Sequence, residues 1–198
     1  MELPGAPATY ALIIANLIAS LYGLLFDRRF VESYLFHIDA IVRRKQHYRI
    51  FTSSFLHGDL LHLLFNMMTL FYFGPVVEQI LGMDGFLVVY FGAILASGII
   101  SFYVNRSNAD YSSLGASDGV SGVLLSFCIF FPMEKIYFLF VPIGIPAIVF
   151  AVVFVAISAG LMGREGNRIS HEGHLGGALA GVALTLLMRP EIIGRMFG

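Results

Sequence analysis

The sequence predicts an all-α polytopic membrane protein, a single domain over residues 1–198 with six transmembrane helices. Hydrophobic residues fill 58% of the 198 positions and charged residues only 13%. Soluble domains average about 45–50% apolar and about 25% charged residues. The mean hydropathy of +0.82 points the same way. Several apolar stretches also approach the roughly 20 residues that a spanning helix needs.

The predicted spans cover residues 9–26, 61–81, 86–104, 117–132, 136–159 and 171–189. We expect the first to be a retained span, because no basic region precedes it as in a cleaved signal peptide. The fourth is short and begins with Ser117, Asp118 and Ser121. We expect that start to lie below the membrane surface, in a water-filled cavity that satisfies its polar groups.

The connections between the spans differ greatly in length. Tight turns are predicted at 82–85 and 132–135, where Gly82, Gly85 and Pro132 stand. Residues 27–60 mix apolar side chains with six of the twelve Lys and Arg residues. This pattern favours a loop with a short helix at the membrane interface, although an ordinary charged loop would also fit. The positive-inside rule would place the loop in the cytoplasm.

Ser117 and His174 are polar residues at the starts of two apolar segments. Such groups at membrane depth are costly and are often functional. A hydroxyl and an imidazole together can form a nucleophile and its general base. Small residues on both segments would let the two helices approach closely, namely Gly119, Gly122, Gly173, Gly177 and Gly181. A structural serine at a helix contact is the alternative for Ser117 alone.

His62 and Asn66 lie four residues apart and therefore share one face of the predicted second helix. Both side chains can donate hydrogen bonds, so the pair could stabilise an oxyanion. The alternative is that they form hydrogen bonds between helices and hold the bundle together.

Other site classes fit less well. The net charge of -1 and the lack of a basic stripe give no reason to expect a nucleic-acid partner. Residues 171–174 fall one residue short of the H-E-x-x-H zinc motif. A metal site is therefore not expected, and one minor alternative stays open, a site made of His57, His62, His171 and His174. Residues 115–119 match G-x-S-x-G, but that motif needs a strand, a turn and a helix in an α/β sheet.

Taken together, the segments resemble the rhomboid family of intramembrane serine proteases, over roughly residues 48–181. The match depends on the order of five segments along the chain. They are Tyr-Arg-Ile-Phe-Thr at 48–52, His-Gly-Asp-Leu-Leu-His-Leu-Leu-Phe-Asn at 57–66, Gly-Pro-Val-Val-Glu at 74–78 with Gly82, Leu-Gly-Ala-Ser at 114–117, and Gly-His-Leu-Gly-Gly at 173–177.

The resemblance implies a Ser–His dyad in a water-filled cavity, with Ser117 as nucleophile and His174 as general base. Asn66, His62 and the backbone N–H of Ser117 would hold the oxyanion. Supporting, structural roles are implied for Arg49, His57, Glu78 and Gly115. No cofactor is expected, and the implied partners are transmembrane protein substrates and membrane lipids. The implied protein is a minimal, prokaryotic form, integral to the cell membrane.

Two residues depart from the family pattern. Asp118 stands where the family has the last glycine of Gly-x-Ser-Gly, and a carboxylate there would disfavour an oxyanion if it pointed inward. Ser121 stands where some members place an aromatic ring that stacks on the histidine. The family orientation, with a cytoplasmic N-terminus, also conflicts with the charge count. Two alternatives remain: a non-catalytic relative that binds transmembrane helices, and a transporter or channel.

Overall fold

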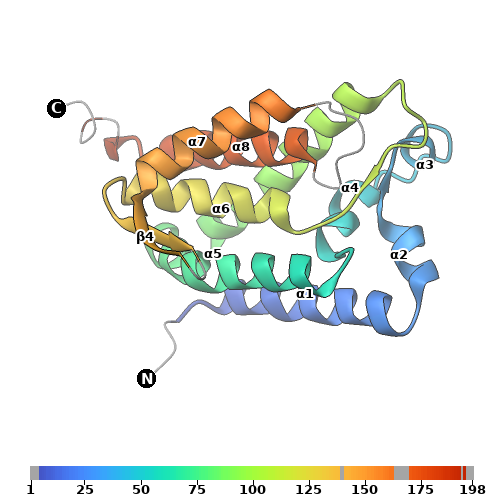
Figure 1. Cartoon of the computed structure of the whole chain (residues 1–198), viewed down its shortest axis with the longest axis horizontal. Helices are drawn as coiled ribbons and strands as arrows, with labels where there is room; N and C mark the ends of the chain where they lie inside the picture. The colour runs from blue at the N-terminus through green and yellow to red at the C-terminus, as the bar shows by residue number, and fades with distance from the viewer. Residues whose placement is uncertain (1–4, 139–140, 163–169, 193, 195–198) are drawn as a thin grey trace.

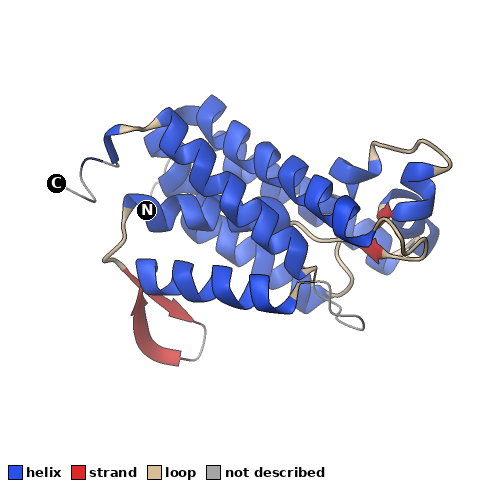
Figure 2. Cartoon of the chain, turned by 90° about the horizontal axis from the view of Figure 1, so that it is seen from above, coloured by secondary structure: helices blue, strands red, loops and turns tan. Residues whose placement is uncertain are grey.

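The computed structural model describes residues 5–138, 141–162, 170–192 and 194. Long helices lie side by side, and two small antiparallel sheets lie at opposite ends of the bundle (Figures 1 and 2). The helices are α1 (Pro7–Leu25), α2 (Arg28–Tyr34), α3 (Ile38–Val42), α4 (Arg49–Thr52), the 3-10 helix η1 (Ser53–Phe55), α5 (Leu60–Asn105), α6 (Ser117–Phe130), α7 (Ala147–Leu161) and α8 (His171–Met188). The strands are β1 (Phe36–His37), β2 (Ser112–Ser113), β3 (Lys135–Phe138) and β4 (Val141–Pro146).

Helix α5 contains the second and third predicted spans, and it is broken at Gly82. Gly82 has φ 75° and ψ 166°, a conformation that glycine adopts without steric cost. The two halves of α5 run in opposite directions (Figure 1). The turn predicted at 82–85 is therefore made largely by this one residue.

The structure corrects the prediction for residues 136–138 and 141–146, which form the paired strands of a β-hairpin and not the start of the fifth helix. Strand β3 pairs with β4, and α7 begins only at Ala147. Pro142 and Pro146 disfavour a helix here, and the β-branched and aromatic residues around them favour strands. The all-α prediction thus holds for most of the chain but not for this hairpin or for β1 and β2. Residues 139–140 of the predicted span lie outside the described residues.

Two helices, α1 and α5, are each long and apolar enough to cross a membrane, whereas α6 and α7 are shorter apolar helices. Helix α8 covers almost all of the predicted sixth span. The structure is therefore mostly helical with membrane-capable helices. The number of six spans stays a prediction.

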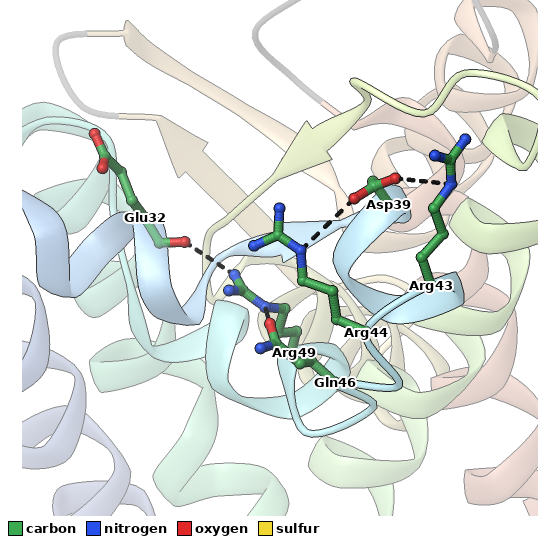
Figure 3. A network of polar contacts seen from close by, with 6 residues as sticks. All are labelled: Glu32, Asp39, Arg43, Arg44, Gln46 and Arg49. Carbon is green, nitrogen blue, oxygen red and sulfur yellow. Dashed lines mark hydrogen bonds and ion pairs between the residues drawn. The ribbon is translucent and has the colours of Figure 1, made fainter.

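The long first loop is a folded unit of three short α-helices and one 3-10 helix around the buried Arg49 side chain. Arg49 Nη1 donates to the carbonyl oxygens of Glu32 and Leu35 at 2.9 Å each, and its Nε donates to Gln46 Oε1 at 2.7 Å. Figure 3 shows the contacts of Arg49 with Glu32 and Gln46, beside the Asp39–Arg43 ion pair of 3.1 Å. One guanidinium thus joins α2, the segment after it and the approach to α4.

Glu78 joins α1 to α5. Its buried carboxylate accepts hydrogen bonds from the backbone N–H groups of Ala8 and Thr9, at 3.0 and 2.8 Å, and from Thr9 Oγ1 at 2.7 Å. The two N–H groups lie in the first turn of α1, where the helix itself offers them no acceptor and where its dipole also favours a negative charge.

Helices α6 and α8 cross at glycines. A Cβ on Gly177 would collide with the carbonyl oxygen of Asp118, and one on Gly181 would collide with the backbone of Gly122. Beyond the crossing, Thr185 Oγ1 donates to Ser126 Oγ at 2.7 Å. This close packing brings the start of α6, with Ser117, against the first turns of α8, with His174.

Candidate active site

A cavity of about 730 Å³ lies between the first-loop unit, α5, α6 and α8. Its walls include all four side chains that the sequence assigned to the reaction, Ser117, His174, His62 and Asn66. Asp59, Ser101, Ser113 and Ser170 add further polar groups. Residues that are more than 100 positions apart in the sequence therefore meet around one polar space.

Ser117 is the first residue of α6 and follows a tight connection from β2. At that connection Gly115 has φ 137°, which side-chain-bearing residues rarely adopt. A Cβ on Gly115 would lie 2.6 Å from His62 Cε1 and 3.5 Å from Ser117 Oγ. The absence of a side chain at 115 thus makes room for the His62 ring beside the Ser117 hydroxyl. A short strand, a turn and a helix do occur here, although without an α/β sheet.

His57 contacts this connection but does not line the cavity. Its Nδ1 lies 2.8 Å from Ser20 Oγ, and its Nε2 accepts the N–H of Ala116 at 3.4 Å. Ser20 Oγ in turn lies 3.0 Å from the carbonyl oxygen of Phe55. These contacts fit a neutral ring with its proton on Nδ1. Burial, aided by His62, lowers the pKa of His57 to about 3, so the ring stays neutral at physiological pH.

Asn66 and His62 lie one turn apart at the start of α5. Asp59 begins that helix by accepting the N–H of His62 at 2.8 Å. Asn66 Nδ2 donates to the carbonyl oxygen of His62 at 3.1 Å, which orients the amide and uses one of its two N–H groups. The other N–H remains for an acceptor in the cavity.

His174 is covered by an aromatic ring that the sequence analysis missed. Phe154 of α7 lies 5.9 Å from the His174 ring, centroid to centroid, at an interplanar angle of 23°. The expected stacking position was Ser121 on α6, which is buried but carries no ring. The ring thus comes from another helix, and no spacing rule within one helix could have predicted it. His174 also borders an apolar groove of about 380 Å³ between α7 and α8.

Asp118 lines the cavity, and its carboxylate is directed toward the first turn of α8. Its Oδ1 lies 2.7 Å from the position that a Cβ on Gly173 would take. Ser97 Oγ and Ser170 Oγ lie within 2.9 Å of the same point. The N-terminal end of α8 favours a negative charge, so the Asp118 carboxylate is better placed there than beside an oxyanion, which is itself negative. Asp118 also lies in the first turn of α6, where the helix dipole favours a negative charge.

The histidines do not form the four-residue metal site left open above. They meet in pairs, His57 with His62 at 4.9 Å and His171 with His174 at 6.3 Å between ring centroids. Within the described ranges no group of three or more His, Cys, Asp and Glu side chains could hold a metal ion.

Arg49 and Glu78 lie outside the cavity walls. Their hydrogen bonds go to the first-loop unit and to the start of α1, as described above. Both therefore contribute to the framework around the site and have no contact with its interior.

Comparison with known proteins assigns a family to this arrangement. Residues 44–191 match the family model of the Rhomboid domain. The chain is 30% identical over 177 residues to the mitochondrial Rhomboid protein 1 of Saccharomyces cerevisiae, which covers 87% of this chain and 51% of that protein. It is 34% identical over 142 residues to the rhomboid protein YdcA of Bacillus subtilis, covering 71% of this chain and 66% of YdcA.

Human presenilin-associated rhomboid-like protein, also mitochondrial, is 31% identical over 138 residues, which is 66% of this chain and 35% of that protein. The chain thus spans about half of the yeast relative's length and about a third of the human one's. The match covers the first-loop helix α4, all later helices through α8, and every candidate site residue.

Proposed function

The chain belongs to the rhomboid family, and on that premise we propose that it is an intramembrane serine endopeptidase. Its substrates would be transmembrane proteins, cleaved in or near the bilayer of the cell membrane by a six-span form of the fold. The observation that carries the proposal is the single cavity whose wall holds Ser117, His174, His62 and Asn66.

In the proposed reaction Ser117 Oγ attacks the scissile carbonyl carbon, and His174 takes the hydroxyl proton. The carbonyl oxygen becomes an oxyanion, held by Asn66, His62 and the backbone N–H of Ser117. When this intermediate collapses, the C–N bond breaks and His174 returns the proton to the leaving amine. Water then attacks the acyl-enzyme in the same way, and His174 again accepts and returns one proton.

A helical substrate hides its scissile carbonyl in backbone hydrogen bonds, so the segment must unwind before it is cut. Small or helix-weakening residues near the cut would lower that cost. Membrane lipids are the natural surroundings of the exposed apolar side chains on α1, α5 and α7, such as Ile18, Tyr72 and Val152. The reaction as proposed uses only side chains, backbone and water.

The Ser117→Ala variant tests this proposal, with Ser121→Ala as its matched control one turn further along α6. Ser121 is buried but does not line the cavity. We expect Ser117→Ala to fold and to lose all cleavage of a model transmembrane substrate, whereas Ser121→Ala keeps it. Equal turnover by Ser117→Ala and the wild type would overturn the mechanism.

A second function, binding of transmembrane helices without cleavage, is favoured by one observation. Asp118 puts a carboxylate in the cavity wall directly after the nucleophile. Folded wild-type protein that captures a transmembrane peptide but neither cuts it nor reacts with a fluorophosphonate would support the binder over the protease.

A further inference from the structure

The first turn of α8 contains a buried carboxylate that the proposed reaction does not use. Glu172 is only 4% exposed. Its Oε1 accepts a hydrogen bond from the Tyr111 hydroxyl at 2.5 Å and another from Asn105 Nδ2 at 2.9 Å. The Tyr111 hydroxyl also lies 3.1 Å from Ser170 Oγ, which caps α8 by accepting the N–H of Gly173.

These contacts join the two segments that carry the proposed dyad. Tyr111 lies six residues before Ser117, on the stretch between the end of α5 and the start of α6. Glu172 lies two residues before His174. Asn105, the last residue of α5, adds a third attachment point. The hydrogen bonds of Glu172 therefore connect the nucleophile's approach segment to the helix of the base.

Tyr111 is itself held on its other side by the first-loop unit. Its carbonyl oxygen accepts the N–H of Ile38 at 3.2 Å, and its ring packs edge-on against Phe36 at 6.1 Å. Strand β1 then pairs with β2 directly after Tyr111, with Phe36 opposite Ser113. Moving Tyr111 would thus move the backbone that leads to Ser117.

The protonation state of Tyr111 favours its hydrogen bond to Glu172. Burial and the hydrogen bond to Glu172 both raise the pKa of Tyr111, so its hydroxyl remains a donor. Burying a carboxylate is costly unless hydrogen bonds replace its water shell, and the Tyr111 and Asn105 donors do so here.

We infer that Glu172 and Tyr111 are positioning residues whose hydrogen bond sets the separation of Ser117 and His174. This inference depends on the proposed function. Neither residue lines the cavity, so both would act through the dyad and not on the substrate. A misplacement of about 1 Å can cost about a hundredfold in rate, so a partial loosening has a measurable effect.

The test compares Tyr111→Phe, Glu172→Gln and the double variant with two controls, Tyr72→Phe and Glu32→Gln. Tyr72 and Glu32 are both exposed. We expect each single variant to lower kcat about tenfold with KM within about twofold, because the substrate's own contacts are intact. The double variant should be no slower than the worse single one, because both changes act on the same bond. Phe has no donor hydroxyl, and the neutral Gln oxygen is a weaker acceptor than a carboxylate. A kcat within twofold of wild type in both single variants, or additive losses, would overturn the inference.

Hydrogen exchange of residues 106–116, measured by mass spectrometry in detergent, provides an arm that needs no catalysis. We expect faster exchange there in Glu172→Gln than in the wild type and in Glu32→Gln. Unchanged exchange would overturn the claim that Glu172 holds this segment against α8. A wild type that neither cleaves nor reacts with a fluorophosphonate would instead overturn the proposed function. The exchange measurement would then decide by itself whether Glu172 connects the two segments.

Discussion

At the scale of single residues, the site depends on side chains that other side chains hold in place. The His174 ring lies against Phe154, and the His62 ring fits beside Gly115 because that residue has no Cβ. The four candidate reacting groups line one cavity, as the sequence analysis expected. Their catalytic roles stay a prediction. The sequence could not predict Phe154 or the Tyr111–Glu172 bond, because both join elements far apart in the chain.

Replacing Phe154 tests whether the ring orients the base. We expect Phe154→Leu to lower kcat several-fold, because His174 then loses the flat surface that limits its rotation, and Phe154→Tyr to retain most of it. Val153→Ala, on an exposed part of α7, is the control. The kcat values come from cleavage of a model transmembrane substrate. A Leu variant as fast as the Tyr variant would show that the ring is only packing.

The buried His57 predicts a pH dependence of stability. Burial lowers its pKa in the folded protein to about 3, from the ordinary value of 6.5. Between these pH values the unfolded protein therefore binds a proton that the folded protein does not. The stability from this group is fully present above about pH 6.5 and falls as pH drops toward 3, by at most about 1.4 kcal/mol per pH unit.

The Tm in detergent, measured between pH 7.5 and 4, checks this dependence. We expect the wild type to lose Tm on acidification more steeply than His57→Gln, in which the ring that must take up the proton is missing. Identical slopes for the two proteins would contradict the account of His57.

At the scale of elements, apolarity predicted most of the helices, and glycine predicted the break in α5. The pair of strands β3 and β4 was missed because its residues are as apolar as those of a helix, although Pro142, Gly144 and Pro146 disfavour one. The two-residue strands β1 and β2 are too short to leave a periodic pattern. The crossing of α6 and α8 was expected from the glycine spacing and is found at Gly177 and Gly181.

This crossing predicts the effect of Gly181→Ala. The new Cβ would meet the backbone of Gly122, which cannot rotate away as a side chain could. We expect the free energy of unfolding to fall by roughly 1–3 kcal/mol, because α8 must move away from α6. For the same reason we expect a fluorophosphonate to label Ser117 more slowly. The matched control is Gly160→Ala on α7, where a Cβ would meet nothing within 4 Å. Equal Tm values for the two variants would contradict close packing at this point.

At the scale of the whole molecule, the fold brings distant polar groups into one cavity while exposing apolar side chains around the bundle. The first-loop unit, tied together by Arg49, and the α1–α5 connection through Glu78 form the framework around that cavity. Family membership predicted from the sequence is confirmed by the family model. The charge count and the family resemblance give opposite membrane orientations, because six of the twelve Lys and Arg residues lie in the first loop.

The central claim is that Ser117 is a nucleophile activated by His174. In a fluorophosphonate reaction its Oγ would bond to phosphorus as fluoride leaves and His174 takes the proton. The most direct measurement is the site and rate of that label by mass spectrometry in wild type, His174→Ala and the exposed control His47→Ala. We predict an adduct on Ser117 in the wild type and in His47→Ala and none in His174→Ala. Labelling of folded His174→Ala at the wild-type rate, or an adduct on another residue, would contradict the claim.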